Sequence, residues 1–304
     1  SLPNVLFILV GGTIAGVGRS ATEYDSGVLN VKELIKTAPE LPRICNVYTK
    51  QLANVDSVNQ NSSINIDLSL TISEEFATGG INGAVFMMGT ATIDQTALFL
   101  DLTINSTNPV VGTGSIRPST DVSADGPGNL MSAAIVASST KARNRGVMVV
   151  FNNKIFSAHL FTKIDANSLD AFHSESSLGT VYKHVAQFFF NPARPSPHHY
   201  FKIDRNTSIP QAQILYGHQE ISPEFISNVI QSGIKILILA SMGGHWTTDG
   251  VESMASLTSK IFIFISGLEM SGFVGGNHGF LGSGYLNPAQ MRIMAQLVVA
   301  TGQD

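Results

Sequence analysis

Charged residues are scarce in this chain, and neither sign of charge dominates. Only 13% of its 304 residues are charged, 43% are hydrophobic, and the formal net charge is -4. A chain of this composition folds into a globular core and is not disordered. Without an excess or a run of positive charge it has no general attraction for nucleic acid. We therefore predict no nucleic-acid partner.

Cysteine clusters and long apolar runs are also absent. The single Cys45 cannot form an internal disulfide, and it has no neighbours that would complete a metal site. The eight histidines are scattered, apart from the adjacent pair His198 and His199. The apolar stretches have the length of strands, well short of the roughly 18 residues that a membrane helix needs. We predict no metal, no cofactor and no membrane association.

Short apolar runs alternate with stretches of helical periodicity, a pattern typical of a parallel α/β sheet. The predicted strands are 5–10, 84–88, 109–111, 146–151, 213–216, 235–240 and 260–266, and the predicted helices are 31–37, 127–139, 223–232, 251–259 and the segment from 288 onward. Three prolines between residues 191 and 199 indicate an extended linker. We expect a larger N-terminal domain with a doubly wound, mainly parallel sheet (1–187), a linker (188–211) and a smaller C-terminal α/β domain (212–304).

Two of the predicted strands end in glycine turns that are followed by threonine. Gly11-Gly12-Thr13 follows the first strand, and Gly89-Thr90 follows the second. Ligands of open parallel sheets bind beyond the carboxyl ends of the strands, and glycine lets the backbone approach them closely. Either turn alone also fits a plain loop or a phosphate loop, although the dinucleotide and P-loop spacings are missing. Thr13 and Thr90 are therefore candidates for chemistry.

These turns and other segments resemble the L-asparaginase and glutaminase-asparaginase amidohydrolases. Residues 8–16 resemble the first signature of that family, and residues 83–92 resemble the second. Further similar segments follow in the family's order, at 100–103, 116–119, 123–127, 162–163, 167–170, 214–216 and 285–288. Segments 167–170 and 282–288 look most like the secreted fungal branch.

The resemblance implies hydrolysis of the side-chain amide of L-asparagine or L-glutamine, with aspartate or glutamate as the product. It implies Thr13 as the nucleophile, Tyr24 on the following flexible loop as its activating partner, and Thr90 as a second threonine that works with an aspartate and a lysine. Ser57 would bind the α-carboxylate of the substrate. The resemblance also implies a homo-oligomer, usually a tetramer, with sites at a subunit interface.

Two groups that the resemblance places beside Thr90 are replaced in this chain. The aspartate that pairs with the substrate ammonium is Ala91, which follows Gly89 and Thr90 in the substrate-binding turn. Counting from the flanking motifs places the lysine at Thr140, with Lys141 next to it. A threonine hydroxyl is a poor nucleophile without a base. We therefore expect weak or impaired hydrolysis, and the alternative is a non-catalytic relative with a structural or interaction role.

Three sequons bear on the compartment of the protein. They begin at Asn61, Asn105 and Asn206. Together with a first residue that is not methionine, they predict a processed, glycosylated protein that is secreted or on the cell surface.

Overall fold

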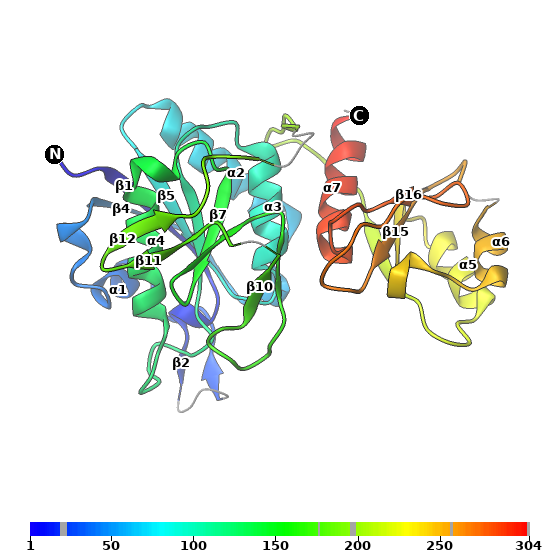
Figure 1. The fold of residues 1–304 in the computed structure, drawn as a ribbon, viewed down its shortest axis with the longest axis horizontal. Coiled ribbons are helices and arrows are strands. Elements are labelled where there is room, and N and C mark those ends of the chain that lie inside the picture. The colour runs from blue at the N-terminus through cyan, green and yellow to red at the C-terminus, as the bar shows by residue number, and fades with distance from the viewer. Residues whose placement is uncertain (19–22, 176, 195–198, 256–257, 303–304) are drawn as a thin grey trace. The chain divides into compact units, whose positions relative to one another are not determined.

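The computed structural model describes residues 1–18, 23–175, 177–194, 199–255 and 258–302. They form two compact units, Ser1–Tyr200 and Phe201–Asp304. Residues 195–198 of the predicted linker and residues 256–257 of the predicted helix 251–259 lie outside the described residues. Each unit is a sheet covered by helices on both faces (Figure 1).

The first unit is built around an eight-stranded sheet. In spatial order its strands are β12 (Val185–Phe188), β11 (Gly179–Tyr182), β8 (Lys154–Ser157), β7 (Val147–Phe151), β6 (Val110–Thr113), β5 (Gly83–Met87), β1 (Asn4–Gly11) and β4 (Asn46–Val55). From β7 to β4 neighbouring strands are parallel, whereas β8, β11 and β12 add antiparallel pairs. The sheet is thus mainly parallel, as predicted.

Helices cover both faces of this sheet because its central strands are apolar on both sides. Helices α1 (Val31–Lys36) and α4 (Gly126–Ser138) lie on one face, and α2 (Ser62–Ala77) and α3 (Ile93–Thr103) lie on the other (Figure 1). Val5, Phe7 and Leu9 of β1 pack into the cluster that contains the α1 and α4 side chains. The intervening residues of β1 are equally buried, which explains the unbroken apolar run of this strand.

The second unit contains a four-stranded parallel sheet. Its strands are β13 (Ala212–Tyr216), β14 (Ile236–Ser241), β15 (Phe262–Gly267) and β16 (Leu281–Gly282). Side chains of α5 (Pro223–Gln231) and α6 (Thr248–Ala255) join one hydrophobic cluster, and those of α7 (Pro288–Thr301) join another. The smaller C-terminal α/β domain is confirmed, although α6 begins three residues before the predicted helix.

The order of the strands creates a switch point beside β1. The chain passes from β1 to β4 on one side of it and then crosses to β5 on the other side. The carboxyl ends of these three strands therefore lie side by side, where open α/β sheets bind ligands. They are followed by Thr13, Ser57 and Thr90.

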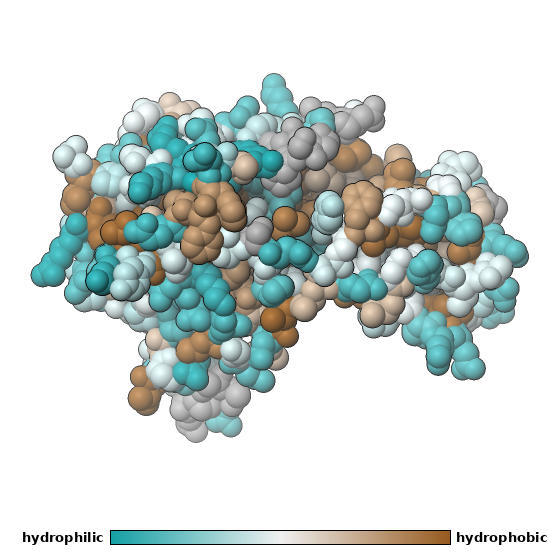
Figure 2. Space-filling model, viewed as in Figure 1, coloured by the Kyte–Doolittle hydropathy of each residue, from teal (hydrophilic) through white to brown (hydrophobic). Residues whose placement is uncertain are grey.

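The described surface mixes hydrophilic and hydrophobic side chains, and Figure 2 shows both kinds interspersed on one face of the molecule. Tyr182, Phe189 and Phe190 are among the exposed aromatic residues. Cys45 is buried, and burial raises the pKa of its thiol to about 11, which makes it unreactive near neutral pH. No helix within the described ranges has both the length and the apolar character to cross a bilayer.

Candidate active site

Backbone contacts between glycines bring the two threonine turns together. Gly12 has a φ of 85°, and a Cβ on it would lie 2.1 Å from the amide nitrogen of Gly89. A Cβ on Gly89 would in turn lie 2.5 Å from Oγ of Ser57. Only glycine at both positions allows this close approach. The segments that follow β1, β5 and β4 therefore form one compact site.

Thr13 is paired with Tyr24, as the resemblance implies. Thr13 begins a 3₁₀ turn (Thr13–Ala15) that directly follows Gly12, and it is 9% exposed. Its Oγ1 lies 2.8 Å from Oη of Tyr24. Tyr24 lies in β3 (Tyr24–Asp25), which pairs with β2 (Val17–Gly18). The structure therefore places Tyr24 in a short two-stranded ribbon, whereas a loop was predicted.

The base of this ribbon is also hydrogen-bonded to the turn after β6. The amide and the hydroxyl of Ser119 both donate to the carbonyl of Gly16, and Thr120 exchanges hydrogen bonds with the backbone of Gly18. The carboxylate of Asp125 accepts from the amides of Ile116 and Arg117 and so fixes that turn. The Thr13–Tyr24 pair thus rests on backbone contacts from a third segment.

Thr90 is paired with a lysine that sequence counting missed. Lys163 Nζ donates to Oγ1 of Thr90 over 2.8 Å, and Thr90 is 8% exposed. Lys163 is the last residue of β9 (Phe161–Lys163), which pairs with β10 (Phe172–Ser174). The second threonine therefore has an amine beside it. Thr162-Lys163 is one of the segments that resemble the family, and that was the signal that could have located it.

The prediction that the lysine position is Thr140 is wrong. Thr140 and Lys141 are exposed and lie in a 3₁₀ turn (Thr140–Ala142) after α4. That turn precedes β7 and contacts β12, so it lies near the amino end of β7, whereas Thr90 follows the carboxyl end of β5. The two edges are separated by the length of a five-residue strand, roughly 16 Å. Lys141 is at the wrong edge of the sheet to replace a lysine at Thr90.

Ser57 and Ala91 complete the site. Ser57 is 4% exposed, its Oγ accepts from the amide of Ala91 over 3.3 Å, and its carbonyl accepts from the hydroxyl of Thr92 over 2.9 Å. The Ser57 hydroxyl hydrogen remains able to donate to a carboxylate. Ala91 is exposed, so its methyl group is not covered by the chain. The structure thus gathers all six candidate residues, and their catalytic roles stay predictions.

The environment of Lys163 favours proton transfer. Burial lowers the pKa of Lys163, and the negative charge of Asp165 opposes this shift only in part. The fraction of neutral amine near neutral pH is therefore larger than for a lysine in water. A neutral amine in contact with a hydroxyl can accept its proton, and its protonated form can return it.

Comparison with known proteins identifies the family. Residues 4–194 match the family model described as Asparaginase, N-terminal, and residues 211–304 match the Glutaminase/Asparaginase C-terminal domain. The chain belongs to the asparaginase family.

Curated relatives and a solved structure agree with this assignment. The chain is 36% identical to "Probable L-asparaginase 1" of Schizosaccharomyces pombe, over 99% of this chain and 86% of that protein. It is 39% identical to "L-asparaginase 2-3" of Saccharomyces cerevisiae, over 99% of this chain and 87% of the relative. A crystal structure named probable cytoplasmic L-asparaginase from Campylobacter jejuni superposes with a TM-score of 0.94 at 32% identity, over 99% and 96% of the two chains.

The prediction of a secreted or cell-surface glycoprotein is contradicted, because this solved structure is named as a cytoplasmic enzyme. One residue of each sequon makes a side-chain hydrogen bond within the chain. The Asn61 side chain caps α2 by accepting from the amide of Ile64. Thr107 accepts from Arg143, and Thr207 bonds to Asp204. The Asn61 cap and the Thr207 turn are ordinary positions for asparagine and threonine.

We predict that Gly12→Ala abolishes most activity while the matched Gly128→Ala does not. The new methyl group would overlap the backbone of Gly89, so the turns must separate. A displacement of about 1 Å in a catalytic group costs on the order of 10² in rate. Gly128 has no atom within 4 Å of the added methyl. The measurement is kcat for both purified variants, and equal values would show that the Gly12–Gly89 contact does not set the site.

Proposed function

We propose that this protein hydrolyses the side-chain amide of L-asparagine, with Thr13 as nucleophile. The relatives named as L-asparaginases support the substrate class. The observation that carries the proposal is the hydrogen bond from Lys163 to Thr90, because it supplies the proton-transfer group that counting along the sequence had lost. The hydrogen bond between the hydroxyls of Thr13 and Tyr24 is the second observation that supports it.

The reaction divides into two steps. In the first, Thr13 Oγ bonds to the amide carbon, the C–N bond breaks, and ammonia leaves an aspartyl ester on Thr13. The neutral amine of Lys163, acting through the Thr90 hydroxyl, takes up the proton that Thr13 loses and then gives it to the departing nitrogen, while Tyr24 keeps its hydrogen bond to Thr13 Oγ1. In the second step water attacks the ester and gives a proton to the same Thr90–Lys163 pair, which passes it to Oγ of Thr13 as the C–O bond of the ester breaks and aspartate leaves. Ser57 donates to the α-carboxylate in both steps.

In this proposal Ala91 weakens the binding of the substrate ammonium, because alanine has no carboxylate to pair with it. Removing one partner from a desolvated ion pair costs about 2–5 kcal/mol, or roughly thirty-fold to several thousand-fold in affinity. The expected impairment therefore concerns substrate binding more than proton transfer. Homo-oligomerisation as a tetramer belongs to the same proposal, since the resemblance implies sites at a subunit interface.

A non-catalytic role is the alternative, and one of its two arguments no longer applies. It depended on the loss of both the lysine and the aspartate beside Thr90. Lys163 lies beside the Thr90 hydroxyl, so of these two replacements the one by Ala91 still favours that alternative. Ammonia release by the purified protein separates the two functions.

We predict ammonia release from L-asparagine by the wild type and a fall of about 10²–10⁴-fold in kcat for Lys163→Met, the usual cost of losing a positioned acid or base. The wild-type kcat should rise with pH through the lowered pKa of Lys163, since the neutral amine is the proton acceptor. This rise of kcat with pH should be absent in Lys163→Met. The measurement is a coupled ammonia assay across the pH range.

Lys141→Met is the control for this prediction. It removes the neighbouring lysine that sequence counting had favoured, and its kcat should stay within about twofold because surface substitutions of this kind are near neutral. Activity lost in Lys141→Met but kept in Lys163→Met would refute the assignment. No ammonia from any form, with the protein folded, would favour the non-catalytic alternative.

A second prediction concerns Ala91→Asp. The new carboxylate would stand on an exposed position in the substrate turn, where it can neutralise the substrate ammonium. We expect the KM for L-asparagine to fall by about tenfold or more, within the range given for such ion pairs. Succinamate, which lacks the amino group, is the control substrate, and its KM should not fall. An unchanged KM for asparagine would mean that another carboxylate already holds the ammonium.

A further inference from the structure

Lys163 is carried by a strand that does not belong to the main sheet. Its strand β9 forms a separate two-stranded sheet with β10, whereas Thr90 follows β5 in the eight-stranded sheet. The ladder that positions Thr90 therefore does not position Lys163. A 2.8 Å contact between their side chains requires another connection between the two substructures.

Part of that connection is apolar. Phe161, two residues before Lys163, packs near Phe156 of β8 and Phe172 of β10, and Phe172 stacks on Phe151 of β7. These rings anchor the segment to the antiparallel side of the sheet. Aromatic clusters fix a segment against a core mainly through the area they bury, whereas a hydrogen bond fixes the distance between two particular atoms.

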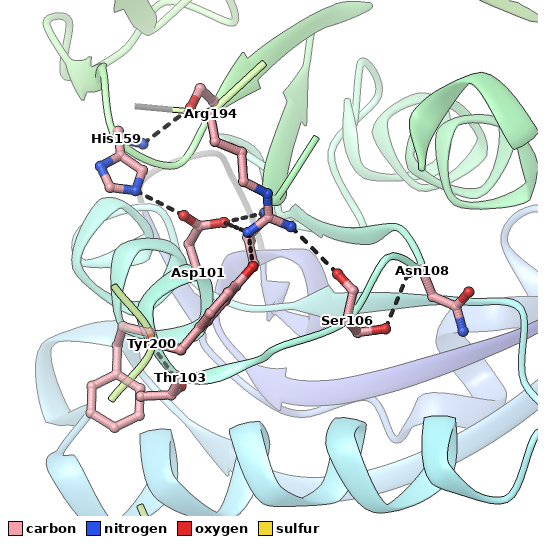
Figure 3. Close-up of polar contacts among 10 residues, drawn as sticks. Asp101, Thr103, Ser106, Asn108, His159, Arg194 and Tyr200 are labelled. Atoms are coloured by element: carbon pink, nitrogen blue, oxygen red, sulfur yellow. Dashed lines mark hydrogen bonds and ion pairs between the residues drawn. The ribbon is translucent and has the colours of Figure 1, made fainter. Parts of the chain in front are cut away.

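The polar part of the connection is a buried histidine–carboxylate pair (Figure 3). His159, four residues before Lys163, lies with Nε2 at 2.8 Å from Oδ2 of Asp101 on α3. His159 is 7% exposed and Asp101 is 3% exposed. A hydrogen bond between such buried groups is directional and costly to break. It joins the chain just before β9 to α3.

Helix α3 connects the His159–Asp101 pair to the turn that contains Thr90. The helix begins directly after Thr92, which follows Thr90 by two residues and donates its hydroxyl to the carbonyl of Ser57. The same helix contacts β9. One rigid element therefore extends from the Thr90 turn to Asp101, and Asp101 holds the segment that carries Lys163.

The rest of the Asp101 environment fixes the carboxylate in place. Its Oδ1 accepts from the amide of Val147 over 2.6 Å, and a Cβ on Gly146 would lie 2.3 Å from that oxygen. Arg194 lies 4.0 Å from the same oxygen and also donates to Tyr200 and to the carbonyl of Ser106 (Figure 3). Burial alone raises the pKa of Asp101, but the bond from His159 and the nearby positive charges lower it below its ordinary value. The carboxylate is therefore a fixed, ionised anchor.

We propose that His159 is a positioning residue that, through its hydrogen bond to Asp101 on α3, sets Lys163 against Thr90. This inference rests on the proposed function only for the role of Lys163 in turnover. Its structural content is that the position and solvation of the Lys163 amine depend on the reach of the side chain at position 159.

Two amide variants that differ by one methylene test this dependence. In His159→Gln the amide nitrogen can take the place of Nε2 and donate to Asp101, whereas in His159→Asn the shorter side chain cannot reach it. Both are neutral and polar. Lys154→Ala is the local control, because it breaks an exposed ion pair with Asp170 in the same part of the unit.

Turnover supplies the first readout. We expect kcat of His159→Asn to fall about 10- to 100-fold with KM within about twofold, since misplacing a group by an ångström has this effect on the chemical step. His159→Gln and Lys154→Ala should keep kcat near the wild-type value. Equal loss in the Gln and Asn variants, or no loss in His159→Asn, would overturn the proposal.

Competitive labelling of amines with acetic anhydride, read by peptide mass spectrometry, supplies the second readout. The midpoint of labelling at Lys163 should move to higher pH in His159→Asn, because a released amine regains water and its pKa returns toward the ordinary value of about 10.4. An unmoved midpoint would leave His159 a purely structural role and sink the proposal. This test needs no turnover, so an inactive wild type would refute the function without deciding the role of His159. If His159→Asn does not fold, a displaced midpoint in His159→Gln would overturn the proposal and a wild-type midpoint there would support it.

Discussion

The site depends on the contact between the Gly12 and Gly89 backbones. Strands β1 and β5 are neighbours in a parallel sheet, but their ladder alone does not bring the turns after them into contact. Because neither glycine has a side chain, the two turns close onto each other and onto Ser57. Thr13 and Thr90 directly follow the two glycines, so their hydroxyls are presented at one place by rigid backbone. Preorganised groups of this kind need little rearrangement during reaction.

Much of the fold could be predicted from the sequence, and the reason is local. Strands β1, β5, β7 and β14 are unbroken apolar runs because both of their faces are covered, and such runs are easy to recognise. Strand β4 is polar and half exposed at the sheet edge, and strands β8 to β12 are three or four residues long. Their pairing is decided by tertiary contacts that carry no periodic signal. The glycine turns identified Thr13 and Thr90 because the constraint on them is also local.

Lys163 was missed for the opposite reason. It reaches Thr90 from a strand outside the main sheet, 73 positions along the chain, and no spacing rule predicts such a contact. Counting between the flanking motifs placed the lysine at Thr140, at the other edge of the sheet, whereas Lys163 lies in β9, beyond the β7–β8 hairpin and outside the counted interval. Ala91 differs in this respect. Its position follows directly from Gly89 and Thr90, so the sequence argument about the missing carboxylate is unaffected by the structure.

Both threonine hydroxyls of the site therefore have a hydrogen-bond partner, and in the proposed function only the position of Ala91 lacks the carboxylate that would bind the substrate amino group. Tyr24 and Lys163 each lie 2.8 Å from one threonine hydroxyl, and the proposal assigns the Ser57 hydroxyl to the substrate carboxylate. The most direct test of this account is rapid acid quenching during turnover of L-asparagine, followed by peptide mass spectrometry. We expect an aspartyl ester on the peptide that contains Thr13. An ester on Thr90, or sustained ammonia release with no ester on either threonine, would contradict the account.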